Sequence, residues 1–365
     1  MSIDLDTKCI PLAHMQTFFD LRKGIVQDIN WLEKRTKIQI NNPNEIFEMI
    51  IGINPDDFYR NAGIDYKNDV VNTFISPRQC LMLIDQIIRA LNMPFLGLVI
   101  GNLMTISHHG MAGVAAVTQP TLAQCLHSIG RYVSELFPVL EMYTTVRGNE
   151  GMFIISENIE IAPYSHFFLE LYMVSFYNCF NHLVGGELKL HSVNFSYPEP
   201  AWGHMYRRYF HNCTVRFNQP LTCLLGEASL GLYELPLANR LMALSAEKIL
   251  FENIPTKSSQ LLPLRLRRLL MRYYGAFPSL DTAASDLGMS ARTLSRKLAE
   301  DGTTYQQILD TLREKLAKEY FSRGGNSVTH IALTLGYTDS SNFAKAFKRW
   351  TGLSPSDFME RIPAE

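Results

Sequence analysis

The sequence predicts a two-domain protein in which an α+β domain precedes an all-α domain. Strand-like and helical segments alternate in the first part of the chain, whereas every segment beyond residue 262 has helical spacing. A polar stretch that contains a proline, NIPTKSSQ, is the best candidate for a linker. We therefore expect an α+β domain at residues 1–235, a helical linker region at 236–261 and an all-α domain at 262–365.

The α+β domain is predicted from changes of period along the chain. Helical spacing indicates helices at residues 15–38, 77–91, 121–136, 165–183, 202–210 and 235–251. Strand-like spacing indicates strands at residues 139–146, 152–156, 188–197 and 214–217, and the polar turn RGNEG between the first two predicts a β-hairpin. The helix at 77–91 has the clearest start, because Ser76 can cap it, Pro77 suits its first position and Gln79 completes a capping box.

The most informative stretch of the all-α domain is residues 327–355, SVTHIALTLGYTDSSNFAKAFKRWTGLSP. A first helix should bury Ile331, Ala332 and Leu335, and Gly336 should end it in the left-handed conformation. Thr338 or Asp339 should cap a second helix, whose apolar stripe is Phe343, Phe347 and Trp350. Two helices around a glycine turn, with polar groups on the outer face of the second, form the helix-turn-helix pattern that docks into a DNA groove.

This pattern occurs twice. Ala284, Leu287 and Gly288 correspond to residues 332, 335 and 336, an offset of 48 residues, while Leu294 and Leu298 match residues 343 and 347 at an offset of 49. One extra residue in the second turn explains the difference. The two units, about 281–299 and 327–350, flank a helix predicted at 305–322, and a shorter helix is expected at 263–274. A rigid connector of this kind lets one chain read two adjacent groove segments if the recognition helices lie about 34 Å apart.

Composition and charge support this division. Hydrophobic residues make up 47% of the chain and charged residues 19%, as in ordinary globular proteins. Residues 1–261 carry 19 Lys and Arg against 24 Asp and Glu, a balance of −5, and residues 262–365 carry 15 against 11, a balance of +4, which together give the net charge of −1. A basic second domain attached to a mildly acidic first domain suits a module that binds a polyanion.

Other classes of protein find little support. The longest apolar runs, of about 14 residues, are shorter than a membrane span, and the N-terminus lacks the pattern of a signal peptide, so we expect a cytoplasmic protein. No P-loop, GxSxG, HExxH or dinucleotide-binding motif is present, and no two of the six cysteines form a CxxC pair. We therefore predict no catalytic residues, no metal site and no cofactor.

The second domain resembles the AraC/XylS family of bacterial transcription regulators, most clearly at IALTLGYTDSSNFAKAFKRWTGLSP. In the first domain, PFLGLVIG, TQPTLAQCLHSIGRYV, VNFSYPEP and VRFNQPL resemble the arabinose-binding-type domain of the ornithine-utilisation-regulator branch. This resemblance implies a regulator that binds double-stranded DNA, with a first domain that senses a small-molecule effector and mediates dimerisation. It also implies contact with RNA polymerase if the protein is an activator.

The predicted DNA contacts follow from the resemblance and from side-chain chemistry. The base-contacting candidates are Arg292, Ser295 and Arg296 in the first unit and Ser340, Ser341, Asn342 and Lys345 in the second. Arginine suits the O6 and N7 acceptors of guanine, and asparagine suits adenine. Thr293, Lys348 and Arg349 are expected to hold the DNA backbone. A basic residue on a helix face, taken singly, is more often only solvated.

The α+β domain is large enough to enclose a pocket, but the sequence does not locate one. Four polar residues in apolar surroundings are candidates for its lining, with a purely structural role as the alternative for each: Arg131, Tyr132, His108 and His109. Two other functions stay open. One is a regulator controlled by a partner protein instead of a small molecule, and the other is an enzyme of the DNA-repair methyltransferase type fused to a DNA-binding tail.

Overall fold

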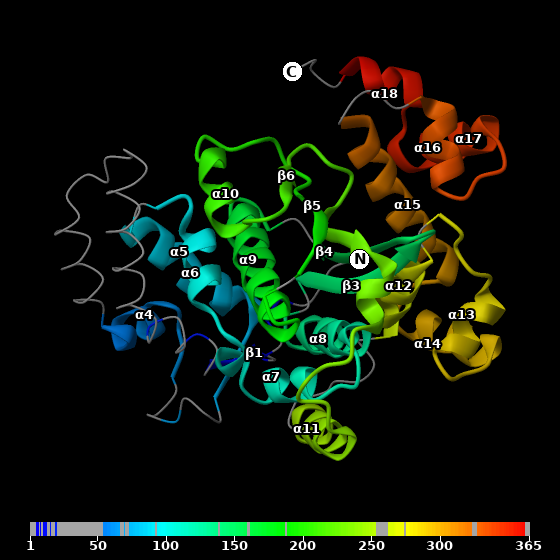
Figure 1. Ribbon diagram of the computed structural model, residues 1–365. Helices are drawn as coiled ribbons and strands as arrows, with labels where there is room; N and C mark the ends of the chain where they lie inside the picture. The colour runs from blue at the N-terminus through cyan, green and yellow to red at the C-terminus, as the bar shows by residue number, and fades with distance from the viewer. Residues whose placement is uncertain are drawn as a thin grey trace. The chain divides into compact units, whose positions relative to one another are not determined.

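The computed structural model describes residues 54–65, 73–91, 93–137, 139–158, 161–186, 188–252, 262–273, 275–322 and 327–361, together with Asp69 and a few single residues before residue 20. The chain divides into two compact units, and the helices of the second are coloured yellow to red in Figure 1. The N-terminal unit comprises Met1–Asn194, Pro198–Phe217 and Leu221–Pro255, and the C-terminal unit comprises Phe195–Tyr197, Asn218–Pro220 and Thr256–Glu365. Most of the helix predicted at 15–38 and the linker at 253–260 lie outside the described residues.

A five-stranded sheet organises the N-terminal unit, in the order β3-β4-β7-β5-β6. Its strands are β3 (Leu140–Arg147), β4 (Glu150–Glu157), β5 (Leu190–Asn194), β6 (Thr214–Arg216) and β7 (Thr222–Glu227). Strands β3 and β4 form the predicted antiparallel hairpin, which turns at Gly148 with φ 61°. The pair β5–β6 is parallel, and the other neighbouring strands are antiparallel. A small pair, β1 (Ile10–Pro11) with β2 (Phe74–Ile75), stands apart.

Strand β7 was not among the predicted strands, although it lies in the middle of the sheet. Residues 222–224 are buried in succession, and Gly226 is buried as well. A strand covered on both faces lacks the apolar–polar alternation that marks a half-exposed strand. The sequence pattern therefore gave no signal for the strand that joins the hairpin to β5.

The N-terminal unit also contains several helices, of which α8, α9 and η3 contact the strands of this sheet. The helices are α4 (Pro55–Asn61), α5 (Pro77–Leu91), α6 (Leu96–Leu103), η1 (Ile106–His109), α7 (Gly110–Val117), α8 (Leu122–Leu136), α9 (Ser165–Leu183), η2 (Gly203–Met205), α10 (Tyr206–Tyr209), η3 (Ala228–Leu232) and α11 (Arg240–Glu252). The long helix α9 packs against α6 and against β4 and β7, and α8 packs on β3 (Figure 1). Helix α7 lies against both α8 and α11.

Local capping explains why several predicted helix boundaries are confirmed. The Ser76 hydroxyl accepts a hydrogen bond from the Gln79 amide at 3.2 Å, and the Gln79 side chain accepts one from the Ser76 amide at 3.1 Å, so the predicted capping box starts α5. Helix α9 also has its predicted bounds. Helix α11 begins at residue 240 instead of 235, because Asn239 Oδ1 caps it by accepting a hydrogen bond from the Met242 amide at 3.0 Å. The helix predicted at 202–210 is divided between η2 and α10.

A buried carboxyl group fixes α9 to its neighbours. Glu170 is 0% exposed, and its Oε1 accepts hydrogen bonds from Trp202 Nε1 at 2.8 Å and from the Tyr206 hydroxyl. Burial raises the pKa of Glu170 to about 8, against the lowering effect of these hydrogen bonds. Helix α6 approaches closely at Gly97, where a Cβ would lie 2.4 Å from the Phe167 carbonyl oxygen.

Within its described residues, the regular elements of the C-terminal unit are all α-helices. Its helices are α12 (Leu262–Arg272), α13 (Leu280–Asp286), α14 (Ala291–Glu300), α15 (Tyr305–Ser322), α16 (Val328–Thr334), α17 (Ser340–Thr351) and α18 (Pro355–Arg361). The pairs α13–α14 and α16–α17 are the two predicted helix-turn-helix units, and α15 connects them (Figure 1). Four residues separate α13 from α14 and five separate α16 from α17, which confirms the extra residue in the second turn.

The repeat has the same core in both units. Leu294 and Leu298 of α14 and Phe343 and Phe347 of α17 are all 0% exposed, as the spacing predicts. Gly288 and Gly336 occupy the left-handed region at φ 72° and 77°, where other residues are strained. Trp350, predicted as part of the apolar stripe, is half-buried.

No single helix among the described residues is long and apolar enough to cross a membrane; α5 and α6, bent by 109°, meet that test only when taken together.

Candidate nucleic-acid interface

The exposed face of α14 carries the three predicted base-contacting residues of the first unit. Arg292, Ser295 and Arg296 are exposed, on the side opposite the buried Leu294 and Leu298. Arg296 donates a hydrogen bond from Nη1 to Glu300 one helical turn later, and its side chain is 62% exposed. Because an exposed pair of this kind contributes little free energy, the guanidinium is available to another acceptor.

The corresponding face of α17 carries different groups. Ser341, Asn342 and Lys345 are exposed, and Ser340 is half-buried. Asp339 caps the helix through Oδ1, which accepts a hydrogen bond from the Asn342 amide nitrogen at 2.7 Å. Its Oδ2 accepts a second hydrogen bond from Asn342 Nδ2, also at 2.7 Å. The hydrogen bond from the Asn342 backbone lowers the pKa of Asp339, so this carboxylate holds both the backbone and the side chain of Asn342.

Two of the three predicted backbone-contacting residues have structural partners. The Thr293 hydroxyl lies 2.9 Å from that of Ser290, the residue that caps α14. Arg349 Nη2 donates a hydrogen bond to Asp310 Oδ2 of α15 at 2.8 Å. Lys348 is exposed. Arg349 therefore joins α17 to the connecting helix, a role that the sequence pattern did not reveal.

Arg313 of α15 lies between the two helix-turn-helix units. Its guanidinium carbon is 5.1 Å from the ring centre of Phe277, which precedes α13, and 4.6 Å from that of Tyr337, which follows α16. Arg313 Nε also donates a hydrogen bond to the Leu335 carbonyl oxygen at 3.1 Å. One side chain therefore contacts both the segment that precedes the first helix-turn-helix unit and the turn of the second.

The backbone segments beside the two helix-turn-helix units also approach each other closely, at Gly275 and Gly336. A Cβ at Gly336 would lie 3.0 Å from the Gly275 carbonyl oxygen, and a Cβ at Gly275 would lie 3.1 Å from the Thr334 carbonyl oxygen. Both glycines have positive φ, at 86° and 77° for residues 275 and 336. Sequence reasoning identified Gly336 as a helix stop but missed this contact.

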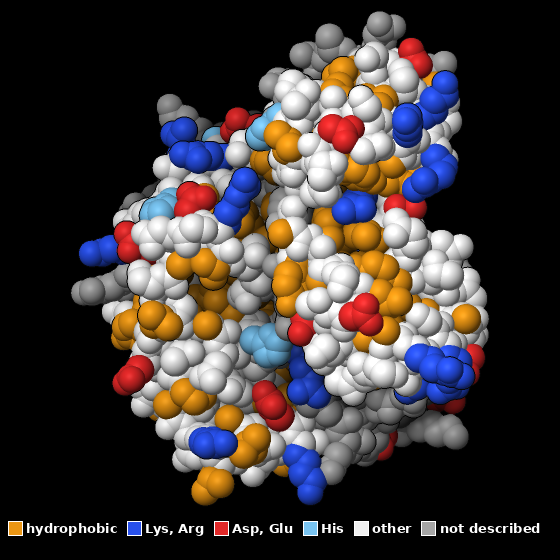
Figure 2. Space-filling model, turned by 90° about the vertical axis from the view of Figure 1, so that its right-hand side faces the viewer, with side chains coloured by type: hydrophobic (Ala, Val, Ile, Leu, Met, Phe, Trp, Pro, Cys, Tyr) orange, Lys and Arg blue, Asp and Glu red, His pale blue; other side chains and the backbone are white. Residues whose placement is uncertain are grey.

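Basic side chains on the face seen in Figure 2 lie in several separate groups, with acidic and hydrophobic side chains among them. The residues predicted to contact bases form two separate groups, one on the exposed face of α14 and one on the exposed face of α17.

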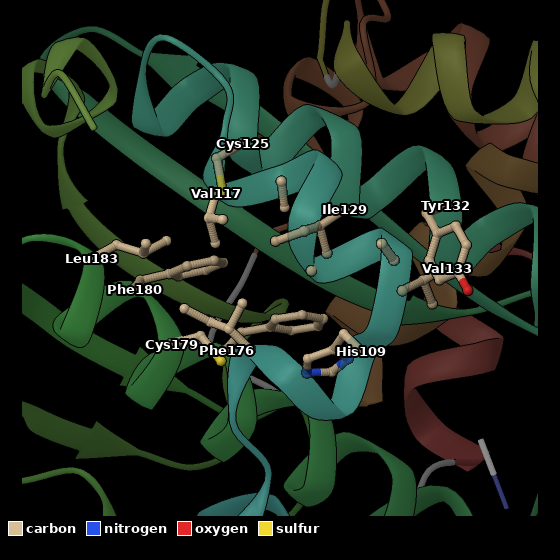
Figure 3. Close-up of a pocket in the computed structure, with 14 residues that line it drawn as sticks. His109, Val117, Cys125, Ile129, Tyr132, Val133, Phe176, Cys179, Phe180 and Leu183 are labelled. Carbon is tan, nitrogen blue, oxygen red and sulfur yellow. The ribbon is translucent and has the colours of Figure 1, made fainter. Parts of the chain in front are cut away.

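A cavity lies within the N-terminal unit, between η1 and α7 on one side and α8 and α9 on the others (Figure 3). Its lining is mainly apolar and consists of Ile106, His109, Ala112, Gly113, Ala116, Val117, Cys125, Ile129, Tyr132, Val133, Phe176, Cys179, Phe180 and Leu183. Most of these residues were not singled out from the sequence, because they come from elements far apart in the chain and carry ordinary core side chains.

Two of the four predicted pocket residues line this cavity. His109 stacks on Phe176 with ring centres 5.8 Å apart, and its Nε2 lies 3.2 Å from the Ser175 hydroxyl. Tyr132 is 9% exposed, and burial raises the pKa of its hydroxyl. The other two do not line it: His108 Nδ1 accepts a hydrogen bond from the Thr105 amide at 3.0 Å, and Arg131 is exposed.

Four of the described cysteines do not have the character of reactive nucleophiles. Burial raises the pKa of Cys125 and Cys223 to about 12, and that of Cys179 and Cys213 to about 11. An alkyl-transferring thiol needs a lowered pKa instead. Within the described ranges, no group of three His, Cys, Asp or Glu residues is placed to hold a metal ion.

Known protein families match parts of both compact units. Residues 52–232 match the "Arabinose-binding domain of AraC transcription regulator", and residues 283–361 match a "Helix-turn-helix domain". The "Ornithine utilization regulator" of Pseudomonas aeruginosa is 34% identical over 268 residues, which cover 73% of this chain and 79% of the relative. The regulator VirS of Mycobacterium tuberculosis is 26% identical over 321 residues, 84% of this chain and 91% of the relative.

Among solved structures, the transcriptional regulator CdpR from Pseudomonas aeruginosa has 22% sequence identity and a TM-score of 0.41, covering 84% of this chain and 96% of its own. The relatives named above are transcription regulators. The helix-turn-helix pairs, the matched N-terminal domain and the identity to the Pseudomonas regulator lead to one conclusion: this chain belongs to the AraC family of DNA-binding transcription regulators.

Proposed function

We propose that α14 and α17 enter successive major grooves of one DNA duplex and that a small molecule bound to the N-terminal unit controls this binding. The observation that carries the first part is the connection between the two units. Helix α15 lies between them, the Arg349–Asp310 pair ties α17 to α15, and Arg313 contacts residues beside both units, which supports one fixed separation of the recognition helices. A fixed separation near one helical turn of DNA, about 34 Å, is what reading two adjacent grooves requires.

The base contacts in this proposal follow from the exposed groups. Arg292, Ser295 and Arg296 read one groove segment, where each arginine can donate two hydrogen bonds to guanine. Lys345 and Asn342, with Ser340 and Ser341, read the other. Thr293, Lys348 and Arg349 lie where they can hold the phosphates, and the last of these also keeps its contact with Asp310.

Effector control has a physical route within the N-terminal unit. Helix α7 has the cavity on one side and packs against α11 on another. Glu247 of α11 accepts hydrogen bonds at Oε1 from Gln119 Nε2 at 3.0 Å and from the Ser128 hydroxyl at 3.1 Å. A ligand that moves α7 against α8 therefore changes the contacts of α11, the last described helix before the C-terminal unit.

A homodimer through the N-terminal unit is also part of the proposal. Several large apolar side chains are exposed along η3, the following turn and α11, among them Leu232, Leu237, Leu241 and Leu244. Exposed apolar side chains in this number support contact with another protein surface. A regulator of this kind acts in the cytoplasm and contacts RNA polymerase if it activates transcription.

The test is selection of bound duplexes from a random DNA library by the full chain. The proposal predicts a motif with two blocks of base preference whose centres are about 10 base pairs apart. A motif with a single block, or no enrichment at all, would contradict two-groove binding. Effector control is tested separately with Glu247→Ala, which removes the acceptor of both hydrogen bonds and should retain DNA binding but lose most of the change in DNA affinity that an effector causes.

A further inference from the structure

We infer that the cavity between α7, α8 and α9 binds an uncharged, mainly apolar small molecule that carries one hydrogen-bonding group, and that it rejects sugars and free amino acids. This inference rests on the proposed effector control, because it assigns the chemical class of the effector. It departs from the sugar named in the description of the matching domain family.

The body of the cavity is hydrocarbon and aromatic. Ten of the residues that line it are Ile, Ala, Gly, Val, Phe or Leu. Phe176 and Phe180 stack with ring centres 5.7 Å apart and form one wall. Helix α7 contributes the small side chains of Ala112 and Ala116 to the lining. Transfer of apolar surface from water into such a site is favourable by about 25 cal/mol per Å².

The polar groups gather at one end. In Figure 3, His109 and Tyr132 lie at one end of the row of lining side chains, and Phe180 and Leu183 lie at the other. The Ser175 hydroxyl adjoins this end, 3.2 Å from His109 Nε2. An apolar ligand with a terminal hydroxyl, carbonyl or phenol group can place that group beside His109 and its body against Phe176 and Phe180.

Charged ligands do not match this lining. Among the residues that the structure describes, the lining contains no Lys, Arg, Asp or Glu, and burial keeps the thiols of Cys125 and Cys179 neutral by raising their pKa values. A buried carboxylate or ammonium needs a partner of opposite charge or several hydrogen bonds. A free amino acid brings both charges into the cavity and finds no ionised Lys, Arg, Asp or Glu there.

Sugars do not match it either. A pentose carries a hydroxyl group on almost every carbon, and each one that is buried without a partner costs about 1–3 kcal/mol. Apart from the thiols, which form weak hydrogen bonds, His109 and Tyr132 are the polar side chains of the lining. The lining therefore offers few partners to the hydroxyl groups of a sugar and would leave most of them without one.

Binding of matched probes to the full chain tests this inference. The uncharged probes are 1-octanol, 2-octanone and 4-ethylphenol, and the comparison probes are octanoate, octylammonium, L-arabinose and L-lysine. Calorimetric titration at pH 7.5 should show at least one uncharged probe binding more than about tenfold tighter than every comparison probe, a difference of ~1.4 kcal/mol. Failure of all three uncharged probes to bind, or tighter binding of any comparison probe, would overturn the inference.

The site is located with a cavity-filling variant and a matched control. Ala116→Leu adds a side chain inside the cavity, whereas Ala201→Leu makes the same change at an exposed position outside it. The first should reduce binding of the uncharged probe at least tenfold, and the second should leave it unchanged. Equal binding by both variants would place the ligand elsewhere and overturn the assignment. If Ala116→Leu does not fold, hydrogen exchange of the wild type is measured with and without the uncharged probe instead. The probe should then protect amides of α7, α8 and α9 and not those of other elements.

DNA affinity measured in the same samples separates this inference from the proposed function. An uncharged probe that binds in the cavity without changing DNA affinity supports the ligand class and contradicts effector control by that ligand. A charged molecule that binds the cavity and changes DNA affinity supports effector control and overturns the ligand class.

Discussion

Helices α14 and α17 begin in similar ways but present different chemistry to a groove. In α14 the cap is Ser290, whose single hydroxyl accepts from the Thr293 amide, and the exposed face carries two arginines. In α17 the cap is Asp339, whose second oxygen holds the side chain of Asn342. The residue best suited to read adenine is therefore engaged by its own helix cap.

This difference indicates that the two helices contribute unequally to recognition of the DNA bases. A guanidinium reaches further than a hydroxyl and can donate two hydrogen bonds to one guanine. The face of α17 offers short hydroxyls, an amide held by Asp339 and one lysine. We therefore expect α14 to carry more of the base discrimination and α17 to contribute more to position on the duplex.

The largest effect should come from the arginines of α14. Arg296→Ala should cost roughly 1–3 kcal/mol of binding free energy and relax the preference at one base position, and Arg292→Ala should act similarly at a neighbouring position. Fluorescence anisotropy with the selected duplex and its single-base variants measures both effects. Equal losses on specific and random DNA would show that neither residue contacts a base.

Loss of the bridge at Arg313 should act on spacing and not on base choice. In the wild type, moving the two half-sites apart by one or two base pairs should weaken binding strongly, because the units are held at one separation. Arg313→Met removes the guanidinium that contacts Phe277 and Tyr337 and should reduce this spacing penalty severalfold. Arg313→Lys keeps the charge as a control and should behave like Arg313→Met, because a lysine cannot stack between two rings. An unchanged spacing penalty in both variants would mean that α15 alone fixes the separation.

A smaller, uniform effect is expected at Lys348, which is exposed on α17. Lys348→Ala should weaken binding to all sequences alike and reduce the slope of log affinity against log salt by about one, as loss of one phosphate contact requires. Affinities measured between low and moderate salt give this slope. A change confined to one DNA sequence would instead indicate a base contact.

The smallest effect tests the cap itself. Asp339→Ser gives α17 the same kind of cap as α14 and releases the Asn342 side chain, so the base preference of the second block should increase by a few-fold. Removing an acidic group near DNA also strengthens binding in general, and random DNA measures that part. The control is the double variant that combines Asp339→Ser with Asn342→Ala. It should lose the gain in base preference at the second block. A gain that persists in the double variant would show that Asn342 does not read the base.

Much of this arrangement follows from local sequence. Helices α5, α9 and α15 have the predicted bounds, because caps, glycines and helical spacing act within a few residues. The exposed face of α14 could be predicted for the same reason, since a helix with a known buried stripe has a known opposite face.

The remaining features depend on contacts between distant residues. Strand β7 is covered on both faces, and its run TCLLGE carries no alternation. Arg313 has the sequence context of any exposed helical arginine, and its two aromatic neighbours lie 24 or more residues away. The cavity combines residues from 106 to 183 that are individually ordinary core residues, so only packing shows that a space remains among them.

Methylation interference on the selected duplex tests the central claim most directly, because a methyl group at guanine N7 blocks contacts in the major groove. We predict two clusters of interfering guanines about one helical turn apart on one face of the duplex, with the stronger cluster lost when Arg292 and Arg296 are both replaced by alanine. A single cluster, or two clusters that both survive the double substitution, would contradict reading of two grooves with α14 as the more specific helix.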